Sequence, residues 1–204
     1  MPSTAHVAWF GDRHARIDQL LRAHRTVGGG GPGRPRHTEQ LNWALTLRLA
    51  GEFQGFGREL HDVAVDHLVA VVAGGNSGLA NVLRAGMTTR RQLDRGNATP
   101  QTLEEDYRRL GLWLWPDLQA ANRRAPAWRA NLTALNDARN AVAHANESQL
   151  LALRARGYPM TLDTVRRWET SLDGLVRTMD HVVGAYLGRV LGTCLLYTSD
   201  AADE

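Results

Sequence analysis

The stretch "TEQLNWALTLRLAGEFQGFGRELHDVAVDHLVAVV", residues 38–72, decides the fold class of this chain. Its apolar residues recur at spacings of three and four, which predicts a long amphipathic helix. Gly51, Gly55 and Gly57 interrupt the pattern, and there we expect a kink or a close contact with another helix. No segment of the chain alternates with period two over a useful length, so no β-sheet is predicted.

The same helical spacing continues on both sides of this stretch. Upstream, a helical pattern stops at "GGGGPGRPR", residues 28–36, which neither a helix nor a strand tolerates well. We therefore predict an N-terminal helix at 1–27, a flexible basic linker at 28–37 and a helical bundle at 38–193. The linker is interpreted as a plain connector in preference to an arm that contacts nucleic acid.

Downstream, "NATPQTLEEDYRRLG" at 97–111 predicts another helix, with Pro100 in its first turn and Thr102 and Glu105 as a capping box. Further helices are expected at about 127–145 and from Thr161 onward. The architecture that these patterns favour is an all-α, antiparallel helical bundle with an additional N-terminal helix.

Composition and charge limit the class of protein. The 204 residues fit one domain, and all 24 basic residues are arginine, either from the base composition of the gene or from selection for phosphate binding. A formal charge of +3 permits a nucleic-acid partner without demanding one. The chain lacks an apolar run of membrane-spanning length and an apolar block typical of a signal peptide, so we expect a soluble cytoplasmic protein without a membrane partner.

The last stretch, "CLLYTSDAADE" at 194–204, differs from the rest of the chain. It contains no arginine and resembles translated sequencing-adapter read-through, so it stays outside the functional interpretation. It also holds Cys194, the only cysteine. Disulfide and thiol chemistry are therefore not expected in the functional part of the chain.

A charged residue stands in the apolar stripe of the helix predicted at 127–145. In "NDARNAVAHAN", residues 136–146, Arg139 falls within the stripe formed by Trp128, Leu132, Leu135 and Val142. Burying an unpaired guanidinium costs several kcal/mol, so Arg139 needs a carboxylate, a phosphate or a route to water. An ion pair with Glu52 or Glu59, or an extended side chain reaching water, is the structural alternative to a phosphate-binding role.

His144 follows Arg139 by five residues, which places it roughly 140° around an ideal helix. The two side chains can share one face only if the helix ends or distorts there, and Asn146 is a plausible terminating residue. The neighbouring Asn140 could orient the histidine or the phosphate, or be a solvated surface amide.

"RNAVAH", Arg139 to His144, resembles the motif of the HEPN superfamily: an arginine, a polar residue, three further residues and a histidine. The predicted layout is also similar, because the motif lies near a helix end, before a loop and one more long helix. The most similar branch that we can name is the RiboL-PSP-HEPN type of bacterial protein, over residues 38–192. The resemblance implies a metal-independent endoribonuclease, often a toxin or defence effector, that works as a homodimer with both motifs at one cleft.

The motif residues suit RNA cleavage by the 2′-hydroxyl, which needs a base, an acid and positive charge at the phosphate. Histidine titrates near neutrality, and arginine stays charged and binds phosphate oxygens in pairs. We therefore assign Arg139, His144 and Asn140 as candidate catalytic residues, with RNA as the substrate and no cofactor. Two subunits would supply two histidines, and a small antitoxin protein is a possible further partner.

Other interpretations remain open. "HDVAVDH" at 61–67 groups His61, Asp62, Asp66 and His67, which could suggest a metal-dependent phosphohydrolase, but a solvated helix face is the preferred interpretation and no metal site is predicted. Trp113 and Trp115 are interpreted as core packing in preference to a base-stacking platform. The alternative function is a non-catalytic HEPN-like module that binds RNA, a nucleotide or a protein partner.

Overall fold

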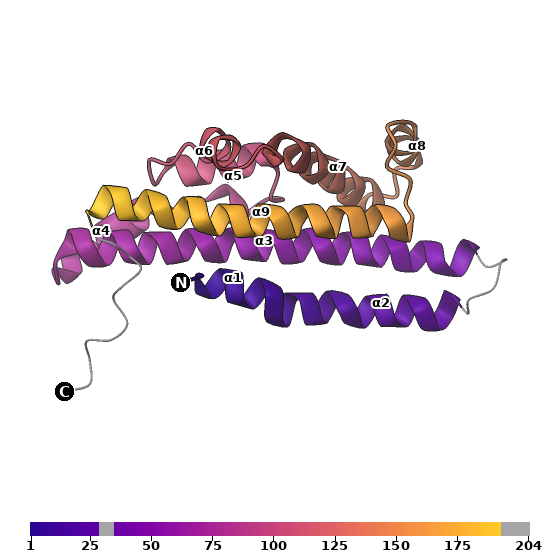
Figure 1. The fold of residues 1–204 in the computed structure, drawn as a ribbon, viewed down its shortest axis with the longest axis horizontal. Coiled ribbons are helices and arrows are strands. Elements are labelled where there is room, and N and C mark those ends of the chain that lie inside the picture. Colours follow the sequence, from indigo (N-terminus) through magenta and orange to yellow (C-terminus); the bar gives the residue numbers. More distant parts are fainter. Residues whose placement is uncertain (29–34, 193–204) are drawn as a thin grey trace.

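The computed structural model describes residues 1–28 and 35–192, which form a bundle of packed helices (Figure 1). Within these ranges there is no strand, and the predicted all-α helical bundle is confirmed. Nor does any helix in them combine the length and apolar character needed to cross a membrane. The elements are α1 (Thr4–Ala8), the π-helical segment η1 (Trp9–Arg13), α2 (His14–Gly28), α3 (Pro35–Ala73), α4 (Ser77–Thr88), the 3-10 segment η2 (Gln92–Asp94), α5 (Pro100–Arg108), α6 (Leu114–Ala121), α7 (Ala125–Ala143), α8 (Glu147–Ala155) and α9 (Leu162–Leu191).

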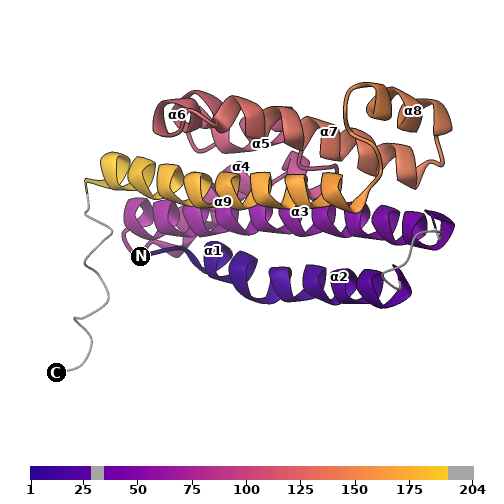
Figure 2. The same ribbon diagram turned by 45° about the vertical axis from the view of Figure 1, so that its right-hand side comes forward.

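The long helices α3 and α9 lie side by side at the centre of the molecule (Figure 1). They run in the same direction: Asn42 near the start of α3 donates to the carbonyl of Met160, just before α9, at 3.1 Å. The helices α2 and α7 run antiparallel to this pair. The chain leaves α3 at one end and returns through α5, α6 and α7, so that α9 begins beside the start of α3. Figure 2 shows α1 and α2 on one side of the central pair and α5 to α8 on the other.

The N-terminal segment belongs to the same hydrophobic core as the rest of the described chain. Trp9 is completely buried and donates from Nε1 to Asp173 of α9 at 2.8 Å. The separate helix predicted at 1–27 is therefore an integral layer of the bundle. The linker boundaries also differ, because Gly28 ends α2 and residues 35–37 are helical in α3. Residues 29–34 of that linker, and the adapter-like tail at 194–204, lie outside the described residues.

Helix α3 continues through the three glycines of its sequence, two of which serve close contacts. A Cβ at Gly55 would come within 2.4 Å of Nη1 of Arg13, whose guanidinium lies across the helix there. At Gly57 the added atom would meet Leu103 at 3.1 Å, whereas at Gly51 it would meet nothing. The expected close helix contact is therefore found at Gly55 and Gly57.

The start of α5 differs in detail from its prediction. Pro100 lies in the first turn as expected, but Thr99 is the N-cap and accepts a hydrogen bond from the backbone N–H of Thr102 at 3.1 Å. The capping box was thus assigned to the wrong residue, because Thr99 already fills the cap position one residue before the proline. This cap fixes the end of the segment that leads from η2 into α5.

Candidate functional site

Helix α7 carries the motif and is held firmly against α9. Trp128, near the start of α7, packs on Gly174 so closely that a Cβ there would approach the indole to 2.4 Å. Three residues along, the Asn131 amide donates to the Ser171 hydroxyl at 2.8 Å. These contacts with α9, together with the buried Leu132 and Leu135, fix the rotation of α7 about its axis. The position of Arg139 is therefore set by packing about one to three turns before it along α7.

Arg139 is half-buried, as its place in the apolar stripe predicts, but it has no carboxylate partner. Glu52 pairs with arginines of α2, α3 and η1, and Glu59 pairs with Arg13 at 2.9 Å. Across residues 1–28 and 35–192, no ion pair involves Arg139. The predicted alternative of an ion pair with Glu52 or Glu59 is therefore wrong. The reason is that both acids face the N-terminal layer, on the far side of α3.

The one hydrogen bond of the Arg139 side chain goes to a neutral group. Its Nη1 donates to Oδ1 of Asn140 at 3.1 Å, and the same oxygen accepts from Nδ2 of Asn97 at 2.7 Å. A guanidinium can only donate, so the oxygen of the Asn140 amide must face it, and Asn97 must then present its nitrogen. Asn140 is therefore not a freely solvated amide: it links Arg139 to the connection between η2 and α5.

His144 lies at the end of α7, where the helix geometry stops. It is the C-cap residue, with φ −106° and ψ 9°, and the next residue, Ala145, has a positive φ of 48°. The expected helix end is therefore present, although Asn146 serves as the N-cap of α8 and not as the terminator. The His144 side chain is exposed, and the described residues offer it no hydrogen-bond partner. The structure joins the side chains of Arg139 and Asn140, whereas His144 is linked to Asn140 only through the backbone, where its N–H donates to the Asn140 carbonyl at 3.0 Å.

Asn97 was not identified from the sequence, and the structure places it opposite the motif. The next residue, Ala98, is also tied to α7, because its carbonyl accepts from Nδ2 of the buried Asn136 at 3.0 Å. Asn136 and Asn140 lie one turn apart on α7, so two amides of this helix bind two consecutive residues of the connection. The sequence "NATP" indicates a helix start but carries no sign of a partner 43 residues away.

The acidic and histidine group at 61–67 is partly solvated, as predicted, because Asp66 and His67 are exposed and Asp62 is half-exposed. His61 is completely buried, so its predicted solvated position is wrong. Its Nδ1 accepts from Arg91 at 3.1 Å and its Nε2 contacts the carbonyl of Asp106 at 3.1 Å, so both ring nitrogens are occupied. Burial, and then the charge of Arg91, lower the pKa of His61. The carboxylates of Asp62 and Asp66 pair with arginines. In the described ranges, no three His, Cys, Asp or Glu side chains are grouped to hold a metal.

Of the two tryptophans before and within the first turn of α6, one lies in the core and the other on the surface. Trp115 is buried and donates from Nε1 to the carbonyl of Pro100 at 2.8 Å, as predicted. Trp113 is 55% exposed, and the Arg108 guanidinium lies 4.2 Å from the centre of its ring, so the core assignment is wrong for this residue. Its place before the start of α6 turns the indole outward while Leu114 and Trp115 fill the core.

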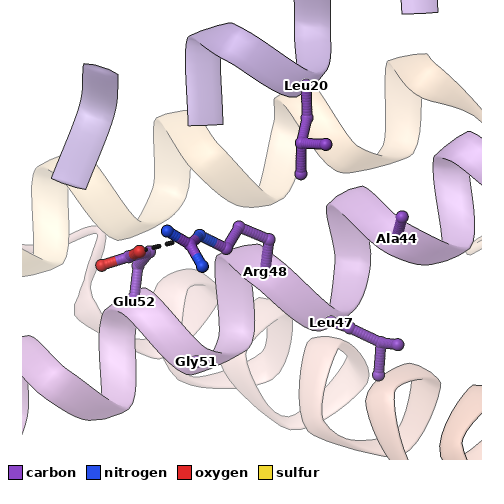
Figure 3. A pocket seen from close by; sticks show the side chains of 6 residues that line it. All are labelled: Leu20, Ala44, Leu47, Arg48, Gly51 and Glu52. Carbon is purple, nitrogen blue, oxygen red and sulfur yellow. Dashed lines mark ion pairs between the residues drawn. The ribbon is translucent and has the colours of Figure 1, made fainter. Parts of the chain in front are cut away.

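A pocket of about 600 Å³ lies between α2 and α3, away from the motif (Figure 3). Figure 3 shows Arg48 paired with Glu52 along α3, with Leu20 of α2 facing them. Burial alone would raise the pKa of Glu52, but the surrounding arginines lower it below its usual value. The lining residues are Leu20, Ala44, Leu47, Arg48, Gly51 and Glu52, none of which comes from α7. This pocket is therefore separate from the candidate site.

Comparisons with known proteins add no family to this description. No family model, curated protein or solved structure matches the chain. The resemblance to the HEPN superfamily therefore rests on the residues of the motif and on the helical layout around it.

Proposed function

We propose that this protein is a metal-independent endoribonuclease that cleaves RNA by attack of the 2′-hydroxyl. One observation carries the proposal: Arg139 holds a half-buried positive charge whose only partner in the described chain is the neutral Asn140 amide. A guanidinium that is partly removed from water without a counter-charge is unfavourable. A phosphate group would supply that counter-charge in the bidentate geometry that arginine favours.

In the proposed cleavage reaction, each motif residue has a distinct role. Arg139 binds the non-bridging oxygens of the scissile phosphate, and Asn140 orients its guanidinium. A histidine accepts the proton of the 2′-hydroxyl, whose oxygen then forms a bond to phosphorus. The bond to the 5′-oxygen breaks, a second histidine protonates that oxygen, and the products are a 2′,3′-cyclic phosphate and a 5′-hydroxyl. His144 serves as one of these two groups.

A second histidine would come from a second copy of the chain, so we further propose a homodimer formed through the motif region. His144 is exposed at the end of α7, which leaves its side chain accessible to a partner. Sedimentation velocity at micromolar concentration would then give twice the chain mass of 22.5 kDa. A monomer under these conditions would contradict the shared site.

The cleavage mechanism is tested with matched nucleic acids. The purified protein, in EDTA, is incubated with an RNA oligonucleotide, with the same sequence as DNA, and with RNA carrying a single 2′-deoxy position. We expect cleavage of RNA to a cyclic phosphate, no cleavage of DNA, and protection at the deoxy position. Cleavage of DNA, or loss of RNA cleavage in EDTA, would point to a different nuclease mechanism.

A non-catalytic module that binds RNA, a nucleotide or a protein is the second candidate. It is favoured by the lack of any group that orients the His144 imidazole within the described chain, because catalytic histidines are held by a third group. This candidate predicts binding of the RNA oligonucleotide through Arg139 without cleavage under any condition of the same experiment. The assignment as a toxin or defence effector, with an antitoxin partner, follows from the family resemblance alone and belongs with the first candidate.

A further inference from the structure

We propose that Asn97 is a positioning residue for Arg139, acting through the carboxamide of Asn140. The inference rests on the proposed function of the motif. It adds to the site a residue that lies outside α7, in the connection between η2 and α5.

The contacts form a directed chain. Asn97 Nδ2 donates to Asn140 Oδ1 at 2.7 Å, and Arg139 Nη1 donates to the same oxygen at 3.1 Å. Without Asn97, the Asn140 amide could rotate about its terminal torsion, which is broad and has two preferred orientations for asparagine. One of these would turn its nitrogen toward the guanidinium and remove the acceptor. Arg139 and Asn97 both donate to Oδ1 of Asn140, so Asn97 restricts the rotation of the amide and stabilises the orientation that holds Arg139.

The backbone around Asn97 is fixed before any substrate binds. The Asp106 carboxylate accepts the backbone N–H groups of Gln92 and Leu93 at 2.9 and 2.7 Å, which anchors η2. Gln54 of α3 donates to the carbonyl of Leu93 at 2.9 Å. After Asn97, the carbonyl of Ala98 is held by Asn136.

The buried arginine at the start of η2 completes this anchorage. Arg91 has a side chain that is only 5% exposed and pairs with Asp62 and Asp94. It also donates to His61 on α3. The internal network built on Arg91 and Asp106 thus ties η2 to α3 and α5, so Asn97 is presented to α7 from a rigid base. A rigid base is what a positioning residue requires, because its effect depends on small displacements.

The expected consequence is a change in rate more than in binding. Arg139 keeps its charge when Asn97 is replaced, so its attraction to a phosphate persists, but its orientation is no longer fixed. We expect Asn97→Ala to lower kcat by about 10- to 100-fold, with KM changed by less than about threefold. Binding of a 2′-deoxy oligonucleotide that cannot be cleaved should change equally little.

The test uses two variants and a matched control. Asn97→Ala removes the side chain, whereas Asn97→Asp keeps its size but removes the donor. A loss of kcat that both variants show therefore does not result from a cavity. Asn131→Ala is the control, because it removes a comparable amide hydrogen bond between α7 and α9, at 2.8 Å, without any link to Arg139. Melting temperatures are measured for all variants, and rates are compared well below the lowest of them.

The double variant Asn97→Ala/Asn140→Ala separates positioning from a general loosening of the structure. If Asn97 acts through Asn140, the double variant should lose no more kcat than Asn140→Ala alone. Independent, multiplied losses would overturn the inference, as would an Asn97→Ala kcat equal to that of Asn131→Ala. These outcomes leave the proposed function standing. If the wild-type protein cleaves no RNA, the proposed function fails and the positioning role fails with it.

Discussion

Arg91 donates a hydrogen bond from Nη1 to Nδ1 of His61, with 3.1 Å between the two nitrogens. Because arginine only donates, Nδ1 of this imidazole must be unprotonated. Nε2 then carries the single proton and donates it to the carbonyl of Asp106 at 3.1 Å. His61 is therefore neutral in the folded protein, and its tautomer is determined by two neighbours on different elements. The pair connects α3 to the segment that carries Asn97.

Stability should fall at acidic pH because of this histidine. The pKa of His61 is lowered in the folded state, chiefly by burial and then by Arg91. The unfolded chain therefore takes up a proton at a pH of about 6.5 that the folded protein does not bind, and stability declines as the pH falls from there toward the folded pKa. The free energy of unfolding is measured in urea at pH 8 and pH 5.5 for wild type and His61→Gln. We expect the advantage of wild type over the variant to be smaller at pH 5.5.

The comparison with His61→Gln isolates this residue. The pKa of His14 is raised mainly by its hydrogen bond to Asp173, so its titration has the opposite effect on stability. Because His14 is present in both proteins, its contribution cancels when their stabilities are compared. An equal advantage at the two pH values would show that His61 binds a proton equally in the folded and unfolded states.

Packing between α7 and α9 should be sensitive at Gly174. A Cβ at this position would lie 2.4 Å from the Trp128 ring, so Gly174→Ala must displace either the indole or the helix. We expect a loss of about 1–3 kcal/mol in the free energy of unfolding, the usual cost of overpacking a core. Gly184→Ala in the same helix is the matched control, since nothing lies within 4 Å of its added Cβ. That variant should be neutral or stabilised by up to about 1 kcal/mol, because alanine favours helix. Similar destabilisation of both variants would refute the assigned contact.

His144→Ala should separate activity from stability. The side chain is exposed at the end of α7 and has no partner among the described residues, so the melting temperature should stay within about 1 °C of wild type. Loss of proton transfer should lower the cleavage rate by about 10²- to 10⁴-fold. Rates of RNA cleavage and thermal unfolding are measured on the same preparations. A folded variant that cleaves at the wild-type rate would rule out the catalytic role of His144.

Arg139 should affect RNA binding as well as cleavage. Arg139→Lys keeps the charge but loses the planar, two-pronged geometry, whereas Arg139→Gln loses the charge. We expect both to lower kcat, and only Arg139→Gln to weaken binding of a 2′-deoxy oligonucleotide strongly. Because no ion pair is broken, the free energy of unfolding should fall by no more than about 1.5 kcal/mol, the value of one hydrogen bond. A much larger loss of stability in Arg139→Lys would indicate a structural role instead.

Much of the candidate site follows from local sequence. The apolar stripe of the helix predicted at 127–145 indicates that Arg139 is partly buried, and the expected helix end near Asn146 places His144 close to it, although the structure ends α7 at Ala143. These features depend on side-chain period and chain termination, both of which are properties of neighbouring residues. The partner of Asn140 could not be predicted in this way, because Asn97 is 43 residues away and its approach depends on how η2 is anchored.

The sequence by itself determined that the protein is all-helical, roughly where its longer helices lie, and that an arginine interrupts the apolar stripe of α7. Helical periodicity and capping act over a few residues, so the chain records them directly. Only the tertiary structure decided that α3 and α9 run parallel and that His61 is buried. It also decided that Glu52 and Glu59 pair with arginines of the N-terminal layer and α3, so that the Arg139 side chain bonds to the Asn140 amide. These outcomes depend on which helices pack together, because a polar group takes the partner that the packed core brings within hydrogen-bond distance.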